Sequence, residues 1–175
     1  PEGQPCPEIG VARCHRRRGG ACLGRSERRL IGQGHRAGGR RMTGEWMPMR
    51  VMEKLAELGL SLPPDWTPRG RFLPFRRDGA VVYLSGQICE WDGAVTLTGP
   101  VEDTPEAVEA ARKAAETCAL NLLYRLREAA DGDLDRVDCV LRLGGFVNCV
   151  PGFAQSPKVI DGATDLFTAL YGERG

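Results

Sequence analysis

The segment best suited to contact a ligand is Ser85-Gly86-Gln87, which follows a short apolar run starting at Ala80. Its hydroxyl and amide can hydrogen-bond a small polar molecule, and its glycine lets a ligand approach the backbone closely. The run from Ala80 to Leu84 is β-branched and aromatic, so it predicts a strand that ends at Ser85. Two interpretations stay open: the segment binds a ligand, or it only terminates the strand.

Catalysis that depends on histidine is excluded for most of the chain. Both histidines, His15 and His35, precede residue 42, so residues 42–175 cannot form a Ser-His-Asp or Cys-His arrangement. The same absence excludes most zinc enzymes. Asp161 and Asp165 lie one helical turn apart and could form a carboxylate pair, but a solvated helix face is the favoured interpretation.

The seven cysteines do not indicate a metal site. Cys14-His15 followed by Cys22 matches no zinc spacing, and Cys6 lies in the same N-terminal part. The other four are scattered singly through the predicted elements, so we expect buried free thiols in a reducing compartment. These four are Cys89, Cys118, Cys139 and Cys149.

The N-terminal part differs from the rest of the chain in charge and composition. Residues 1–41 hold ten arginines against three glutamates, a net charge of +7, together with nine glycines and no aromatic residue. Such a segment cannot bury enough apolar surface to offset its ordering entropy, so we expect residues 1–46 to be disordered. Translation from upstream of a native start at Met42, Met47 or Met49 is the favoured explanation, and a basic nucleic-acid-binding tail is the alternative.

The remaining residues carry 14 basic against 20 acidic groups, a net charge of −6, which argues against a nucleic-acid partner for residues 42–175. No apolar run reaches about 18 residues, so we expect no membrane span. No signal-peptide core is present, and a cytoplasmic location is expected.

The first half of the expected domain, residues 47–175, reads as a helix followed by three strands. A helical apolar pattern runs from Met49 to Leu60. Asp78-Gly79 predicts a two-residue hairpin turn between residues 71–76 and the strand that ends at Ser85. A second turn at residues 91–93 leads to a third strand at residues 94–98, which completes a three-stranded meander.

The second half reads as helix, strand, helix. Thr104 and Pro105 are typical of a helix start, and Asp131-Gly132 should end that helix. Residues 137–147 alternate as a strand that Gly144-Gly145 interrupts, with a bulge or a close backbone approach. A last helix runs from Ser156 to a stop at Gly172. The order β-β-β-α-β-α favours an α+β fold, a mixed sheet with helices on one face. The fourth strand is apolar on both faces, so it should have neighbours on both sides.

A series of short motifs in this order resembles the Rid (YjgF) family, reactive intermediate deaminases also known as endoribonuclease L-PSP or chorismate-mutase-like proteins. The resemblance covers about residues 49–175. Its motifs are Leu58-Gly59-Leu60, Gly70-Arg71-Phe72, Tyr83-Leu84-Ser85-Gly86-Gln87, Thr104-Pro105-Glu106, Ala119-Leu120-Asn121-Leu122, Gly145-Phe146-Val147, Pro151-Gly152-Phe153 and Asp161-Gly162-Ala163-Thr164-Asp165.

The resemblance implies a chorismate-mutase-like fold and a homotrimer with ligand pockets between subunits. It implies hydrolysis of enamines and imines such as 2-aminoacrylate, small carboxylate-bearing metabolites, to 2-keto acids and ammonia, with no metal or cofactor. Family deaminases use an arginine and a glutamate on a C-terminal β-hairpin that would follow Gly175, so the resemblance assigns no catalytic residue within this chain. It assigns a pocket lining, which consists of Phe72, Ser85, Gly86, Phe146 and Val147.

Two departures from the family pattern concern this pocket. Phe72 stands where family deaminases have a tyrosine, and Pro151 stands where they have an asparagine. Each change removes a hydrogen-bonding group. The hypotheses are an enamine/imine deaminase that is inactive without the expected hairpin, a non-catalytic trimeric metabolite-binding protein and, least favoured, an endoribonuclease.

Overall fold

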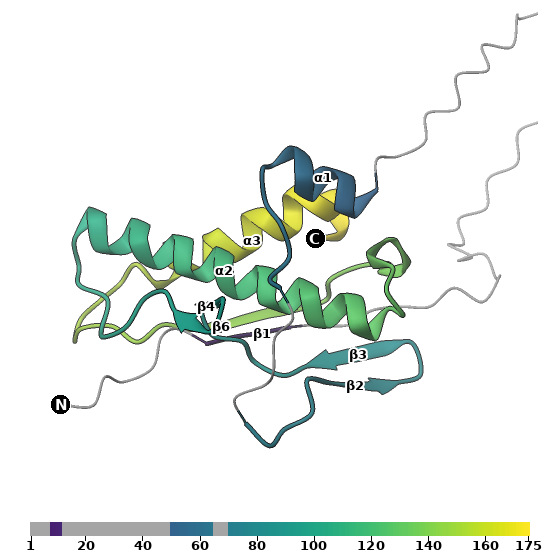
Figure 1. Cartoon of the computed structure of the whole chain (residues 1–175). Helices are drawn as coiled ribbons and strands as arrows, with labels where there is room; N and C mark the ends of the chain where they lie inside the picture. Colours follow the sequence, from purple (N-terminus) through teal and green to yellow (C-terminus); the bar gives the residue numbers. More distant parts are fainter. Residues whose placement is uncertain (1–7, 12–49, 65–69) are drawn as a thin grey trace, which may run out of the picture.

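The computed structural model describes residues 8–11, 50–64 and 70–175. In Figure 1 the three helices lie on one side of the molecule and the strands on the other, so the expected α+β arrangement holds, but the described strands form separate antiparallel pairs rather than the expected mixed sheet. The helices are α1 (Val51–Glu57), α2 (Pro105–Ala129) and α3 (Ser156–Tyr171), with 3-10 turns at Leu134–Arg136 and Gly172–Arg174. The strands are β1 (Glu8–Val11), β2 (Phe75–Asp78), β3 (Val81–Leu84), β4 (Glu90–Trp91), β5 (Ala94–Val95) and β6 (Leu143–Phe146).

Helix α2 forms where its capping residues predict it. The Thr104 hydroxyl oxygen accepts a hydrogen bond from the Ala107 backbone N–H at 3.2 Å, and Pro105 occupies the first turn. The chain leaves the helix through Asp131 and Gly132, whose φ angles are +56° and +90°. The predicted helix is confirmed, and its buried face, rich in alanine, lets other elements approach closely.

Helices α2 and α3 make the most extensive contact between helices in the described part of the chain. Gly162 of α3 is buried against the backbone of Arg112 in α2, where a side chain would have no room. Phe167 and Leu170 of α3 are almost completely buried in the same core. The helix stops at Gly172, where φ is +63°, so the predicted last helix is also confirmed.

The two short hairpins use different turns. In the first, Asp78 pairs with Val81, so the loop is Gly79-Ala80, one residue later than expected. Only Gly79 has a positive φ, as in a type II′ turn, where a single glycine suffices. In the second, β4 pairs with β5 across Asp92 and Gly93, both with positive φ, as in a type I′ turn.

The expected three-stranded meander is wrong. The described strands form three separate pairs, β1-β6, β2-β3 and β4-β5. The physical reason lies in Asn121 of α2, whose side-chain amide donates to the carbonyls of Ile88 and Glu90. These bonds fasten the chain to the helix just after β3, so the next residues do not continue along the first hairpin.

The expected strand at residues 137–147 is shorter than predicted. Only β6 forms a ladder, antiparallel to β1, and Gly144 and Gly145 lie within that ladder in regular register rather than at a bulge. Before it, the Val140 backbone N–H donates to the Arg174 carbonyl at 2.7 Å, so this stretch is fastened to the end of the chain and not to a strand. Of the N-terminal residues 1–46, for which disorder is predicted, the structure describes residues 8–11 as strand β1, and the others lie outside the described residues.

Cys118, Cys139 and Cys149 are not disulfide-bonded. Cys118 is buried as expected, whereas Cys139 and Cys149 are only half-buried. Cys89 is disulfide-bonded, so the prediction of a free thiol is wrong at this position. Cys6, Cys14 and Cys22 lie outside the described residues. No helix in the described part of the chain is long and apolar enough to cross a membrane.

Candidate functional site

The end of strand β3 places Ser85 against the segment that precedes β2. The Ser85 backbone N–H donates to the Pro74 carbonyl at 3.0 Å, and its hydroxyl donates to the Leu73 carbonyl at 2.6 Å. Both donors of Ser85 are thus used within its own hairpin. The hydroxyl can reach a ligand by rotating about its Cα–Cβ bond, at the cost of the Leu73 hydrogen bond.

Phe72 precedes Leu73 in the sequence. The hydrogen bond from the Ser85 hydroxyl to the Leu73 carbonyl therefore brings Phe72 and Ser85 into one corner of the molecule. The Phe72 side chain is 46% exposed. Its ring packs over Gly70, where a Cβ atom would lie 2.5 Å from two ring carbons. Gly70 therefore lets the ring fold back on its own chain, which leaves an aromatic surface beside the end of β3.

Gly86 adds a backbone donor to this corner. Its N–H makes no hydrogen bond to another described residue. Its carbonyl accepts a hydrogen bond from the Gln87 side-chain amide at 3.0 Å, and the same amide donates to the Ser85 carbonyl at 3.0 Å. The buried Gln87 side chain thereby fixes the direction of both peptide groups. We call Phe72, Ser85 and Gly86 the β3 corner.

Phe146 and Val147 are positioned by a different pair of strands. Phe146 ends β6, opposite Glu8 of β1, and its side chain is 76% exposed. Val147 is half-buried and packs against the hydrophobic core. The structure thus groups three of the five expected pocket residues at the β3 corner and places the other two at the end of β6.

Two buried amides lie next to this site: Gln87, which belongs to the candidate segment named from the sequence, and Asn121, which was not predicted as a functional residue. Asn121 is 3% exposed, and its Nδ2 donates to the Ile88 carbonyl at 3.0 Å and to the Glu90 carbonyl at 2.8 Å. Gln87 is 1% exposed. The oxygen of each amide is buried and lacks a hydrogen-bond partner. The available signal for Asn121 was its place between Cys118 and Leu122, inside the apolar stripe of α2.

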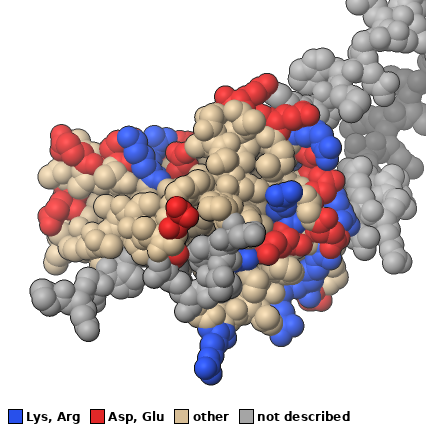
Figure 2. All heavy atoms as spheres, in the orientation of Figure 1, with Lys and Arg blue, Asp and Glu red and all other residues tan. Residues whose placement is uncertain are grey.

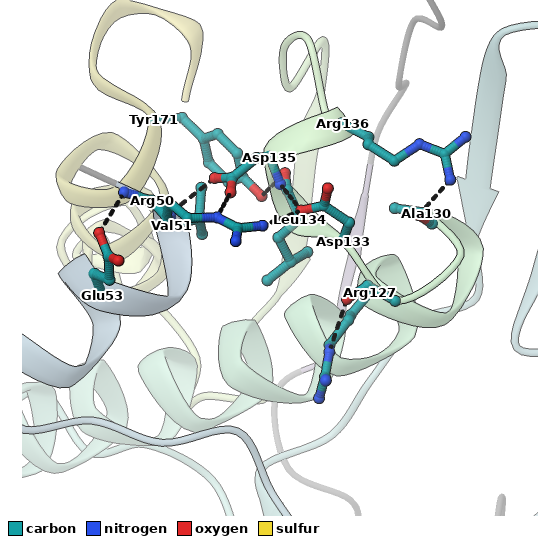
Figure 3. A network of polar contacts seen from close by, with 11 residues as sticks. Arg50, Val51, Glu53, Arg127, Ala130, Asp133, Leu134, Asp135, Arg136 and Tyr171 are labelled. Atoms are coloured by element: carbon teal, nitrogen blue, oxygen red, sulfur yellow. Dashed lines mark hydrogen bonds and ion pairs between the residues drawn. The ribbon is translucent and has the colours of Figure 1, made fainter. Parts of the chain in front are cut away.

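The acidic residues of the turn after α2 form ion pairs with arginines (Figure 3). Asp135 accepts from the Arg50 guanidinium at 2.7 Å and from the Val51 backbone N–H at 2.8 Å. Partial burial raises the pKa of Asp135, but these hydrogen bonds outweigh it and hold the pKa below its ordinary value. Asp133 lies 3.4 Å from the same guanidinium.

The neighbouring carboxylate, Asp131, lies between two other arginines. The Arg136 guanidinium is 2.5 Å from its Oδ2, and the Arg77 guanidinium of β2 is 3.5 Å away. The hydrogen bond from Arg136 is the main cause that lowers the pKa of Asp131. On α3, Asp165 pairs with Arg112, which supports the interpretation of a charged helix surface rather than a carboxylate pair with Asp161. These carboxylates stabilise the fold, and acid–base chemistry is not assigned to them.

No group of three potential metal ligands occurs among the residues that the structure describes. On the face shown in Figure 2, acidic and basic side chains are interspersed, and no single sign dominates the described part of that face. The chemistry that the site can supply is therefore hydrogen bonding by a backbone N–H and a hydroxyl beside an aromatic ring.

Comparison with known proteins gives three informative matches. No family model matches the sequence. A curated relative, Protein TCP17 of Trypanosoma cruzi, is 35% identical over 124 residues, which cover 71% of this chain and 76% of the relative. The solved structure of Atu1372 from Agrobacterium tumefaciens, a protein of unknown function, is 37% identical with a TM-score of 0.63 and covers 71% of this chain and 74% of its own.

The third match is a crystal structure from Shewanella oneidensis, described as that of a "putative endoribonuclease". It is 28% identical with a TM-score of 0.66, and the match covers 72% of this chain and 82% of the other. In all three cases the match spans more than two thirds of each protein, so the likeness concerns most of the fold and not a single motif.

Proposed function

Because the chain belongs to the Rid (YjgF) family, we propose that it serves to hydrolyse enamines and imines of the 2-aminoacrylate type to 2-keto acids and ammonia. In this reaction the enamine first tautomerises to the imine. Water then adds to the imine carbon, and the tetrahedral adduct loses ammonia to leave the keto group. The imine carbon is itself electrophilic, so the reaction needs positioning and proton transfer rather than redox chemistry.

The observation that carries the proposal is the pair of donors at the β3 corner. The Gly86 N–H has no partner among the described residues, and the Ser85 hydroxyl can turn from the Leu73 carbonyl to a ligand. Two adjacent donors suit the carboxylate of a 2-imino acid. Phe72 offers an apolar surface beside them, without the hydroxyl of a tyrosine, which favours a substrate with an apolar side chain.

Proton transfer requires groups that the β3 corner does not contain. The family resemblance expects an arginine that binds the substrate carboxylate and a glutamate that orients water, both on a hairpin following residue 175. The proposal therefore includes these two residues, and the 175-residue chain alone should not accelerate the reaction. The amides of Gln87 and Asn121 act as positioning groups, since they fix the peptide planes of residues 85–90.

Self-association into a trimer is part of the proposal. Tyr83 of β3 and Phe146 of β6 are 60% and 76% exposed, although both lie in strands. Figure 1 shows that the helices cover only one side of these strands. Large exposed apolar side chains on an uncovered sheet face favour burial against another subunit. A pocket between subunits would then combine the β3 corner of one copy with residues of the next.

A second candidate is a non-catalytic protein that binds a small carboxylate metabolite. The observation in its favour is that Asp131, Asp135 and Asp165 are each paired with an arginine, so none of these three is placed as a general base. RNA cleavage, suggested by the description of the Shewanella relative, receives less support. On the described part of the face shown in Figure 2, charges of both signs are interspersed, whereas proteins that bind single-stranded nucleic acid present a continuous basic groove.

The deciding experiment compares the 175-residue chain with a chain extended by the residues that its gene encodes next. An imine is generated in situ, and ammonia release is followed against the uncatalysed rate. The proposal expects acceleration by the extended chain and none by the shorter one. Saturable binding of the keto acid without acceleration by the extended chain would establish the binding protein instead.

Light scattering on both chains tests the trimer separately. The extended chain should have three times the mass of one subunit, and Phe146→Asp should shift it towards the monomer. A monomeric extended chain that still deaminates would overturn the proposed pocket between subunits.

A further inference from the structure

A groove of about 410 Å³ lies on the helical side of the molecule, apart from the β3 corner. One wall is the face of α2 that carries Lys113, Glu116 and Leu120, which are spaced three and four residues apart. The opposite wall is Leu60 and Ser61, from the segment after α1. Trp91 of β4 closes one side. None of these residues belongs to the expected pocket lining.

The groove exists because the chain turns sharply after α1. Gly59 has a φ of +71°, and its N–H donates to the Ala56 carbonyl at 2.9 Å. The next N–H, from Leu60, donates to the Leu55 carbonyl at 3.0 Å. These bonds send the following residues across α2, as Figure 1 shows, and hold them above its surface. The wall is therefore a fixed part of the fold.

The charges that line the groove are not used within the described structure. Lys113 and Glu116 share one face of α2, yet neither forms an ion pair with another described residue. The charged residues next to them behave differently, since Arg112 pairs with both Glu109 and Asp165. Trp91 and Leu60 pack half-buried against the core, so the groove lining combines these two charges with apolar surface.

We propose that this groove binds a small zwitterion with an apolar side chain, of the free α-amino acid class. Lys113 would hold the carboxylate, Glu116 the ammonium group, and Trp91 with Leu120 the side chain. The volume lies within the range of about 300–1,000 Å³ typical of small-molecule sites. A cation and an anion on adjacent turns of one helix match the separation of charges in such a ligand, and a single carboxylate or ammonium would satisfy only one of them.

The test titrates the full chain with three related probes. Binding of each probe is measured by calorimetry and by tryptophan fluorescence. L-leucine carries both charges, N-acetyl-L-leucine only the carboxylate, and L-leucinamide only the ammonium group. We expect L-leucine to bind most tightly. Lys113→Gln should weaken L-leucine binding about five- to tenfold and leave L-leucinamide unchanged. Glu116→Gln should weaken L-leucine by a similar factor and leave N-acetyl-L-leucine unchanged.

Glu106→Gln is the matched control, because Glu106 is an exposed acid on the same helix outside the groove, and it should leave all three affinities unchanged. Unchanged circular dichroism in each variant would exclude misfolding as the cause. The proposal is overturned if L-leucine shows no saturable binding, if the three probes bind equally, or if neither groove variant alters the affinity. These readouts do not involve deamination, so this test can fail while the proposed function stands.

Discussion

Replacing Gly162 with alanine should lower the free energy of unfolding, although alanine is the better helix former. Helix propensity alone favours alanine over glycine by about 1 kcal/mol in a helix interior. In the structure, however, a Cβ atom at position 162 would lie 2.9 Å from the Arg112 carbonyl carbon, with the carbonyl oxygen closer still. The atom in the way is backbone, so relief requires α2 and α3 to move apart.

The magnitude follows from the difference between these two effects. Overpacking a well-filled interior typically costs about 1–3 kcal/mol, and the severe overlap at Gly162 favours the upper end of this range. Subtracting the propensity gain of about 1 kcal/mol leaves an expected loss of about 2 kcal/mol. For a chain of this length, that loss corresponds to a decrease in Tm of about 4–8 °C.

Urea unfolding monitored by circular dichroism measures the effect, with the m value checked for constancy. The control is Ala169→Gly at an exposed position of the same helix, which isolates propensity and should cost about 1 kcal/mol. The two variants thus move glycine and alanine in opposite directions, yet both should destabilise. A Gly162→Ala protein that is more stable than the original by about 1 kcal/mol would show that the helices do not cross as closely as described.

Three other predictions follow from the site and the ion pairs. Asn121→Leu should lower the free energy of unfolding by about 1–3 kcal/mol, because it leaves the carbonyls of Ile88 and Glu90 without their hydrogen-bond donor. An unchanged urea midpoint would contradict this role of Asn121. Ser85→Ala should raise KM for an imine substrate about 5- to 30-fold in the extended chain with little change in kcat, whereas an unchanged kcat/KM would identify Ser85 as a strand terminator only. The pKa of Asp135 is lower in the folded state than its ordinary value of 3.8, so its stabilising contribution is present above that pH and is lost as the pH falls through the folded pKa. Acid unfolding of Asp135→Asn should therefore depend less steeply on pH below about 4, and an identical acid transition would contradict the role of the Arg50 pair.

Local signals in the sequence were enough to predict the two long helices. Thr104 and Pro105 at one end of α2, and Asp131-Gly132 at the other, act through the backbone groups next to them. The same holds for the end of α3 at Gly172. Such caps need no knowledge of the rest of the fold, because the hydrogen bonds and φ angles that they satisfy lie within a few residues.

Strand pairing was predicted less well because it depends on distant residues. The alternating pattern at residues 137–142 indicated a strand, but no neighbouring backbone forms a ladder with it in the described structure. The hairpin loop is Gly79-Ala80 and not the predicted Asp78-Gly79. Both choices place Gly79 at a loop position that requires a positive φ, so the sequence could not distinguish them. At the site, the sequence indicated Ser85 and Gly86, whereas the amide of Asn121 could be assigned only once α2 was placed beside residues 88–90.

The turn after α2, which includes residues 133–137, affects the order in which parts of the structure unfold and refold. Helix α1 has seven residues, too few for a stable isolated helix, and its first turn is anchored through Arg50 and Val51 to Asp135. The helix should therefore form only after this turn has reached its native position. In native-state hydrogen exchange, the amides of α1 and of residues 133–137 should exchange together as one cooperative unit, before those of α2.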